Sequence, residues 1–493
     1  MKKIKISIFI ALFIPIAIAF GMDAIFAEDI SEAGAIELSL DNVIALAVKN
    51  NIDVKIAKYD ALISSTDIDR ERSVFDTVLS VDADYSVDKL MRSSTISGSK
   101  EVVTDYNAGL TKMIPSGTTL GLDFTNVRSK SDSAFAALNP SYEPKVEFSL
   151  VQELARNAFG IIDRGNVTAA QLEYAGASFT SLEHIEDAIG EAEKRYWDLV
   201  FASDEKALRQ DALKAAEDLY DINKGRLDKG LVEDVELVAS EANLAKRRTD
   251  LIIAQNNIDR AVNALKLAIN DSSDLYIMPA DMLKLSGGNI SFDEALKTAV
   301  KNRRDYNIAR TAVKERDLKV KMRSNARWPQ IDMDATFAVN GIDKKYVDSL
   351  NKISTDKYEY GVGFAFSYPL ENREAASRHS RAVFEKAKAL LELEKAERRI
   401  VREIDDAVKR VKVYGIKADE YNKISGLQEM KLGEERKRFN YGRSDSDTVI
   451  RFQDDLIEAR ISAKAALLEY NYALIDMKLT EDTLLGELGV DKL

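Results

Sequence analysis

The chain repeats one plan twice, and this internal duplication constrains its fold more than any single motif does. Residues 38–43 (LSLDNV) open the first half, and residues 290–295 (ISFDEA) open the second. Further along, apolar residues recur every seven positions in both halves, with an offset of 212 between the two series: Leu237, Leu244, Leu251, Ile258 and Leu265, then Val449, Leu456, Ala463, Tyr470 and Met477. A duplicated unit of this size predicts a symmetric assembly of long elements and not a single catalytic pocket.

The N-terminus has the pattern of an export signal peptide, which we place at residues 1–27. Three lysines within the first five residues precede an apolar run over 6–20, and cleavage is predicted after Gly21 or after Ala27. An uncleaved membrane anchor is the alternative, but Pro15 and the short apolar run argue against it. No other segment approaches the ~20 apolar residues that a membrane-spanning helix needs.

The composition excludes several classes of protein. The chain has no cysteine, so an exported form must be held by packing or assembly instead of disulfides. A formal net charge of −12 and the lack of a basic stripe argue against nucleic acid as a partner. The two histidines, His184 and His379, form no metal-binding pattern, and no phosphate-binding loop is present. We therefore predict no catalytic residue, no cofactor and no metal ion.

Two long tracts without proline, 145–278 and 370–493, are rich in helix-forming residues and predict long helices. The seven-residue repeats lie within these tracts and indicate coiled-coil seams, in which each helix packs against a neighbour. Each tract is interrupted once by a glycine turn, at Gly230 and at Gly442. Because glycine readily takes the backbone conformation that ends a helix, each tract is predicted to fold as a helical hairpin.

The lengths of the arms predict how the helices stack. In each half, a short helix before the strands and a short return arm together match one long arm, so the short helices should lie end to end beside it. The predicted segments are 39–72 and 233–271 beside 152–229, and 291–327 and 445–488 beside 372–441. At about 1.5 Å per residue such rods are roughly 100–120 Å long. The resulting divisions are a first structural repeat at 28–270, a linker at 271–289, a second repeat at 290–488 and a tail at 489–493.

Between the short and the long helices the hydrophobic period changes from about 3.6 to 2, which predicts β-strands. Residues 81–88 (VDADYSVD) and 331–337 (IDMDATF) alternate in this way, and a second pair follows at 146–150 and 362–366. The alternation fits either a soluble sheet half-buried on a core or a barrel with lipid outside and water inside. Combined with the export signal and the long rods, it favours the barrel.

The first half also carries an insertion at about 90–145, between its two strands. Within it, the segments 106–110 and 120–124 flank a turn at Pro115 and Gly117, which predicts an extra hairpin. This hairpin either enlarges the barrel or caps it from outside.

Together these elements resemble the TolC-like outer-membrane efflux proteins, also called outer membrane factors. The resemblance covers nearly the whole mature chain. It is carried by residues 38–51 (LSLDNVIALAVKNN), by their copy at 290–303, and by residues 361–370 (GVGFAFSYPL), which resemble the last-strand signature of that family ending in Pro-Leu. The glycine turns at Gly230 and Gly442 resemble the tips of the family's helical hairpins.

The resemblance implies an α+β membrane protein. In that family three copies assemble, and each donates four antiparallel strands to one shared transmembrane β-barrel in the outer membrane of a diderm bacterium. Coiled-coil hairpins form a tunnel across the periplasm. Cargo arrives from an inner-membrane pump of the ABC, RND or MFS type through a periplasmic membrane-fusion adaptor, for drug or small-molecule efflux or for type I secretion. The implied adaptor contacts are the tip residues Gly230, Leu231, Val232, Gly442, Arg443 and Ser444.

Two features depart from the family pattern. Aspartates often form a ring just past the second tip, but the corresponding positions here hold Thr448 and Arg451. Nearby carboxylates offer a substitute: Glu233, Asp234, Glu236, Asp445 and Asp447. They form either a negative constriction at the entrance or an ordinary solvated helix face. In addition, the insertion would raise the strands per copy from four to six if its hairpin joins the barrel.

Two other functions fit the sequence less well. A soluble periplasmic coiled-coil adaptor or scaffold typically has one helical hairpin followed by small β domains, whereas this chain predicts two hairpins and alternating strands. An exported enzyme would need a candidate site, and the residues offer none.

Overall fold

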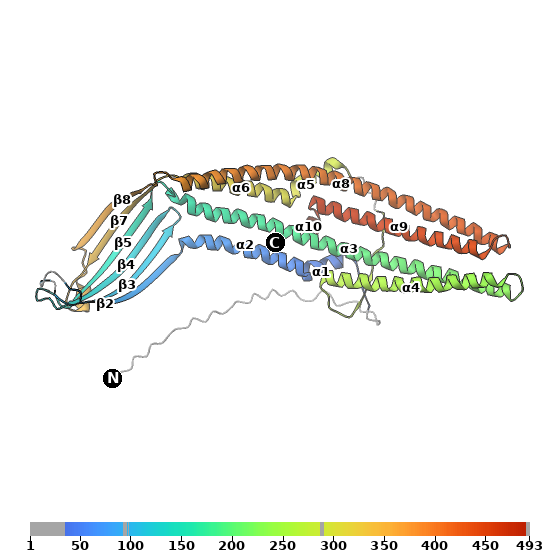
Figure 1. Cartoon of the computed structure of the whole chain (residues 1–493), viewed down its shortest axis with the longest axis horizontal. Coiled ribbons are helices and arrows are strands. Elements are labelled where there is room, and N and C mark those ends of the chain that lie inside the picture. Colours follow the sequence, from blue (N-terminus) through green and yellow to red (C-terminus); the bar gives the residue numbers. More distant parts are fainter. Residues whose placement is uncertain (1–34, 92–95, 97, 286–289, 490–493) are drawn as a thin grey trace, which may run out of the picture.

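The computed structural model describes residues 35–91, 96, 98–285 and 290–489. The predicted signal peptide (1–27), the linker residues 286–289 and the tail residues 490–493 lie outside the described residues. Within that part of the chain, a β-sheet forms one end of an elongated molecule and two helical hairpins form the other (Figure 1).

The helices of the two halves match in length. The first half contains α1 (Leu40–Asn50), α2 (Ile52–Arg72), α3 (Ile161–Leu227) and α4 (Asp234–Ile269). The second half contains α5 (Phe292–Asn302), α6 (Arg304–Asn325), α8 (Arg373–Asn440) and α9 (Ser446–Glu481). The long helices α3 and α8 have 67 and 68 residues, and the return helices α4 and α9 have 36 each. At about 1.5 Å per residue, each of the long helices α3 and α8 extends about 100 Å.

The short helices stack end to end beside the long ones, as their lengths predicted. Helices α2 and α4 both lie along α3, and α6 and α9 both lie along α8 (Figure 1). The first long arm begins later than predicted. The strand β5 (Ser141–Glu153) runs past residue 152, and positive φ angles at Asn157 and Phe159 break the chain before α3 begins at Ile161.

Each short N-terminal helix is divided in two, which corrects the predicted single helices at 39–72 and 291–327. The first break lies at Asn51, whose side-chain oxygen caps α2 and whose amide donates 2.7 Å to the carbonyl of Ala268 at the end of α4. The second break lies at Arg303, whose guanidinium donates 3.0 Å to the carbonyl of Thr480 at the end of α9. The residue at each break therefore ties together the two helices that stack there.

The predicted return arm at 445–488 is also shorter than expected. Helix α9 ends at Glu481 because Asp482 adopts a left-handed conformation with φ of 52°, and a short helix α10 (Leu484–Glu487) follows. The 3-10 turns Ser73–Phe75 and Ala158–Gly160 connect helices to strands at the other end.

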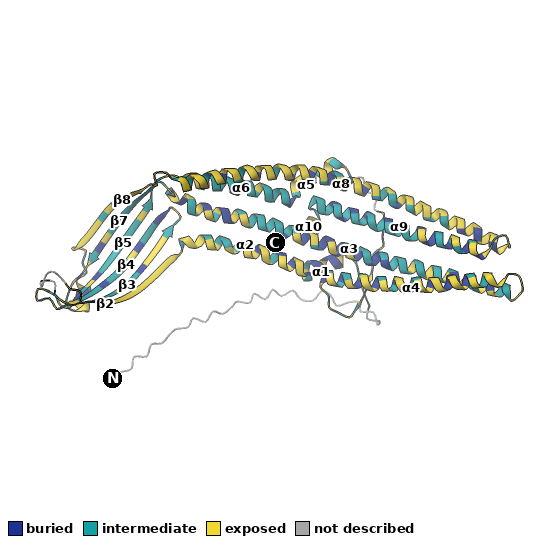
Figure 2. Ribbon diagram, viewed as in Figure 1, coloured by how far each residue is buried: buried dark blue, intermediate teal, exposed yellow. Residues whose placement is uncertain are grey.

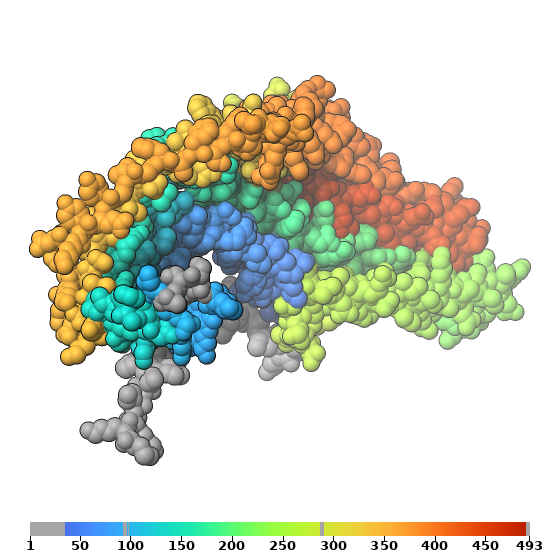
Figure 3. Space-filling view, turned by 60° about the vertical axis from the view of Figure 1, so that its left-hand side comes forward, coloured from blue at the N-terminus to red at the C-terminus, as the bar shows by residue number. Residues whose placement is uncertain are grey.

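Six antiparallel strands form the main sheet, in the order β2-β3-β4-β5-β7-β8. Their bounds are β2 Thr77–Asp88, β3 Glu101–Ile114, β4 Thr118–Ser131, β5 Ser141–Glu153, β7 Gln330–Asn340 and β8 Tyr358–Ser367. A short helix, α7 (Tyr346–Asn351), lies between β7 and β8. The insertion of the first half supplies β3 and β4, so its hairpin lies within the sheet and not beside it. Viewed with the sheet brought forward, the molecule follows an arc from α8 and β8 to β2 and α2 (Figure 3).

A second, two-stranded sheet pairs the start of the described chain with the predicted linker. Strand β1 (Ala35–Leu38) runs parallel to β6 (Tyr276–Pro279). Ile277 and Leu283 are buried against α1, α3 and α4. The described part of the linker thus packs on the helices.

The core follows the seams between helices (Figure 2). All five residues of the α9 heptad series are buried, whereas Leu237 and Leu251 of the α4 series are only half-buried. Large apolar side chains remain exposed along two of the helices: Ile52, Ile56, Tyr59 and Ile63 on α2, and Phe384, Leu391, Val413 and Leu427 on α8. The four residues on α2 are three or four positions apart and so lie along one face of the helix. An exposed apolar stripe of this kind marks a place where another surface packs.

None of the helices in the described residues combines the length and the apolarity that crossing a membrane requires.

Candidate functional site

The hairpin tips form the end of the molecule opposite the sheet. At both tips the chain reverses through a glycine with positive φ, 65° at Gly230 and 69° at Gly442. A Cβ at either glycine would meet no atom within 4 Å. The left-handed backbone conformation, and not lack of space, is therefore what favours glycine at these two turns.

The predicted tip residues lie together at this end, and most face solvent. Leu231 is 70% exposed, Arg443 is exposed, and Val232 and Ser444 are half-buried. A groove of about 640 Å³ runs between the two tips and is lined by residues of both, Leu231 and Tyr441 among them. The two turns thus form one surface.

Specific contacts join the two hairpins just above their turns. Arg226 of α3 donates 3.1 Å to the carbonyl of Phe439 on α8, and its guanidinium lies 4.2 Å from the centre of the Phe439 ring. Asn223 donates 2.8 Å to the hydroxyl of Ser446. The backbone N–H of Ser446 in turn donates 3.0 Å to the carboxylate of Glu236. These contacts fix one tip against the other.

The five candidate entrance carboxylates therefore fall into two groups. Glu236 and Asp445 bind the N-terminal turn of α9: Asp445 accepts a 2.7 Å hydrogen bond from the backbone of Thr448. That hydrogen bond is the main reason why the pKa of Asp445 lies below its ordinary value. Glu233, Asp234 and Asp447 are exposed and face solvent in the single chain.

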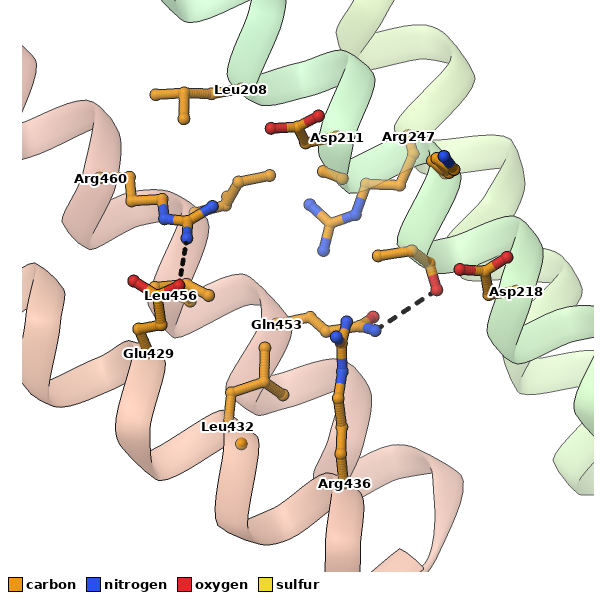
Figure 4. A pocket seen from close by; sticks show the side chains of 15 residues that line it. Leu208, Asp211, Asp218, Arg247, Glu429, Leu432, Arg436, Gln453, Leu456 and Arg460 are labelled. Atoms are coloured by element: carbon orange, nitrogen blue, oxygen red, sulfur yellow. Dashed lines mark hydrogen bonds and ion pairs between the residues drawn. The ribbon is translucent and has the colours of Figure 1, made fainter. Parts of the chain in front are cut away.

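A pocket of about 470 Å³ lies between the hairpins, farther from the tips (Figure 4). Three of the seven charged residues that line it form ion pairs. Arg247 of α4 has a side chain only 2% exposed and forms an ion pair with Asp454 of α9, and Arg460 contacts Glu429 at 2.9 Å. We interpret this pocket as part of the seam that joins the two hairpins, and not as a ligand site.

The two faces of the sheet differ sharply in chemistry. Following the strand register, every acidic residue of the six strands falls on the same face: Asp82, Asp84, Asp88, Glu101, Asp105, Asp123, Glu143, Glu147, Glu153, Asp332, Asp334 and Glu359. Lys145 is the one basic residue that these strands place there. We call this surface the acidic face.

The opposite face of the sheet is mainly apolar and aromatic. It includes Tyr85, Tyr106, Phe148, Phe337 and Phe364, which belong to five different strands. The basic residues Lys112, Arg128 and Lys130 lie on this face near the strand ends. We call it the apolar face.

No family model and no curated protein matches the chain. Solved structures do match. A crystal structure of CusC, reported with the conformational changes that accompany its folding and transmembrane channel formation, has a TM-score of 0.69 and 12% identity. The match covers 91% of this chain and 92% of that one. The MtrE outer-membrane channel of Neisseria gonorrhoeae has a TM-score of 0.65 and 18% identity, covering 90% and 88%.

The outer-membrane protein VceC of Vibrio cholerae likewise matches with a TM-score of 0.64 and 14% identity, covering 91% of this chain and 96% of that one. The chain has the TolC-like outer-membrane channel fold. This confirms the predicted resemblance and the predicted fold class, which combines long helical hairpins with an antiparallel sheet. Because the sequence identities are only 12–18%, the similarity to these TolC-like channels is a similarity of fold.

The sequence pattern predicts only part of the acidic face and of the contacts between the tips. The alternation at Asp82, Asp84, Asp332 and Asp334 was visible in the sequence. Asp88 and Glu147 lie in the alternating segments 81–88 and 146–150 as well. The other six carboxylates of the acidic face were missed because their common side depends on the register between strands. The contact of Arg226 with Phe439 was also missed, since these residues lie 213 positions apart.

Proposed function

We propose that this chain is the outer-membrane duct of a tripartite export system. In this proposal three copies assemble in the outer membrane of a diderm bacterium, with the helical hairpins extending into the periplasm. An inner-membrane pump and a periplasmic membrane-fusion adaptor deliver the cargo, which crosses the duct passively. No enzymatic step is assigned to the chain.

The observation that carries this proposal is the separation of the two faces of the sheet. A transmembrane barrel needs an apolar surface toward lipid and a polar surface toward its water-filled interior. The apolar face and the acidic face meet that requirement along all six strands. The strands have 10 to 14 residues, whereas a tilted strand needs about 9–11 to cross the hydrocarbon core.

Assembly into several copies follows from the sheet edges. In the described residues, β2 and β8 each have one strand neighbour and end the sheet. An open sheet edge in lipid would leave backbone groups without hydrogen bonds, at several kcal/mol each. Pairing between copies removes both edges, and the exposed apolar side chains of α2 and α8 give the copies a further surface on which to pack.

The tips are the proposed contact with the adaptor. Gly230, Leu231 and Val232 of one turn, with Gly442 and Arg443 of the other, lie farthest from the sheet. Together with Ser444 they form one exposed surface at the end where cargo would enter. Drug or small-molecule efflux and type I secretion of a protein are both compatible with this surface, and pumps of the ABC, RND or MFS type are alternative partners.

Fractionation of the native protein tests the proposal. Inner and outer membranes and periplasm would be separated, and the mass of the detergent-extracted particle would be measured by light scattering. A heat-labile trimer in the outer membrane is the expected result. A monomer or dimer that stays in the periplasmic fraction without detergent would refute the duct and favour a soluble coiled-coil adaptor or scaffold.

A further inference from the structure

The inserted hairpin of the first half is a complete part of the sheet. Strand β3 pairs with β2 from Lys112 opposite Thr77 to Glu101 opposite Asp88. Strand β4 pairs with β3 and with β5 over nearly its full length. If the hairpin were a cap outside the sheet, β2 would instead have to lie beside β5.

The hairpin also has the same chemistry as the strands on either side of it. Tyr106 on β3 and Leu122 on β4 lie on the apolar face, as Phe148 on β5 does. Asp105 and Asp123 lie on the acidic face. The two inserted strands therefore continue both surfaces of the wall without interruption.

The two edges of the sheet are suited to each other. Six strands that alternate in direction leave β8 antiparallel to β2, so β8 of one copy can extend the sheet of the next copy in the antiparallel sense. Their apolar side chains are among the most exposed of the sheet: Tyr85 of β2 is 69% exposed and Phe364 of β8 is 70% exposed. The adjoining helices carry exposed apolar residues as well, with Tyr59 on α2 and Phe384 on α8.

We propose that three copies join β8 to β2 in a closed barrel of eighteen strands, in which the β3–β4 hairpin is part of the wall. This inference rests on the proposed trimeric duct. For strands about 4.8 Å apart and tilted by about 40–45°, eighteen strands give a backbone radius of about 18–20 Å, whereas twelve give about 12–13 Å. The wall is thus about 1.5 times wider than four strands per copy would make it, and it encloses a water-filled, acidic lumen.

Distances between copies test the width directly. Because the chain has no cysteine, a single spin label can be attached at one site per copy in the full-length protein. Phe364→Cys places the label on β8, and Tyr106→Cys places it on the inserted hairpin; both positions lie on the apolar face. Leu122→Cys on β4 replaces the second variant if it fails to insert. Pulsed electron paramagnetic resonance then measures the separation in detergent-extracted particles of known mass.

In an eighteen-stranded trimer, equivalent backbone positions are about 31–34 Å apart. The labels point outward, so the measured separation exceeds this value by the outward reach of the label arm, and the two sites give the same separation. If the backbone separation at Phe364, after the outward reach of the label arm is subtracted, is about 21–23 Å and the separation at Tyr106 is larger, the hairpin lies outside a twelve-stranded wall. That result would overturn this inference and leave the duct intact. A particle that is not a trimer, or that is not in the outer membrane, would overturn both.

Discussion

Glu193 is an acidic side chain buried in the middle of the rod. It lies on α3 with 5% of its surface exposed. Loss of hydration on burial raises the pKa of Glu193 to about 7, an effect that nearby Lys478 opposes and that Glu487 and Asp41 reinforce. At neutral and higher pH the folded protein must therefore hold a charge where little water can solvate it. We predict that Glu193→Gln stabilises the protein in a manner that depends on pH.

The size and sign of the effect follow from the two pKa values. The ordinary pKa of a glutamate is 4.5 and that of Glu193 in the folded protein is about 7. Between these values the folded state binds more protons than the unfolded state, so the free energy of unfolding falls as the pH rises. The loss is complete above pH 7 and amounts to about 3 kcal/mol, at about 1.4 kcal/mol per pH unit. Glutamine has nearly the same shape and no charge, so Glu193→Gln should recover up to this amount at pH 8 and less than about 1 kcal/mol at pH 5.

Hydrogen–deuterium exchange of α3 peptides that contain residue 193 measures this gain. Variant and parent protein are compared at the same pH, which cancels the intrinsic pH dependence of exchange. Exchange in Glu193→Gln should be slower by up to about 100-fold at pH 8 and by only a few-fold at pH 5. Glu191→Gln is the matched control, because Glu191 lies on the same helix but is 51% exposed. An equal effect of Glu193→Gln at both pH values, or faster exchange at pH 8, would refute the reasoning.

Three further predictions concern other parts of the molecule. Glu186→Ala removes a buried carboxylate that pairs with Arg304 and accepts the first N–H groups of α10, so local stability should fall by about 3–5 kcal/mol. The loss caused by Glu186→Ala should be smaller in a protein that already carries Arg304→Met. If chemical denaturation shows that the two losses simply add, the pairing is contradicted. Asp332→Asn with Asp334→Asn should lower the preference for cations in planar bilayers, measured as a smaller reversal potential in a KCl gradient; an unchanged potential would show that the acidic face does not line the pore. Gly442→Val should abolish export with the trimer still inserted, whereas Gly442→Asn, which tolerates positive φ, should retain it. Normal export by the valine variant would argue against the tip contact.

Much of the helical architecture could be predicted because its determinants are local. Long tracts without proline, seven-residue repeats and the turns at Gly230 and Gly442 are each visible within a short window of sequence. The breaks in the short helices were not predicted. Asn51 is a recognisable helix cap, but Arg303 at the equivalent position carries no such signal and acts through a contact with Thr480, 177 residues away.

The candidate site was predictable only where one strand or one turn sufficed. The tip residues were located from the glycine turns alone. Two of the five predicted entrance carboxylates, Glu236 and Asp445, turned out to bind the first turn of α9. Helix caps formed between hairpins depend on how the hairpins pack, and that packing is not contained in the local pattern. The same holds for the acidic face, which emerges only when six strands are aligned.

The matched helix lengths restrict how such a chain can change. The arms of the two hairpins have 67 and 36 residues in the first half and 68 and 36 in the second, which sets both tips at one level. A deletion in α3 alone would shift one turn out of line with the other and break the contact of Arg226 with Phe439. Because the seams repeat every seven residues, a tolerated change of length would remove or add whole heptads in all four arms at once. Insertions of other sizes should be confined to the sheet loops, so homologous proteins should vary in their loops and share a common rod length.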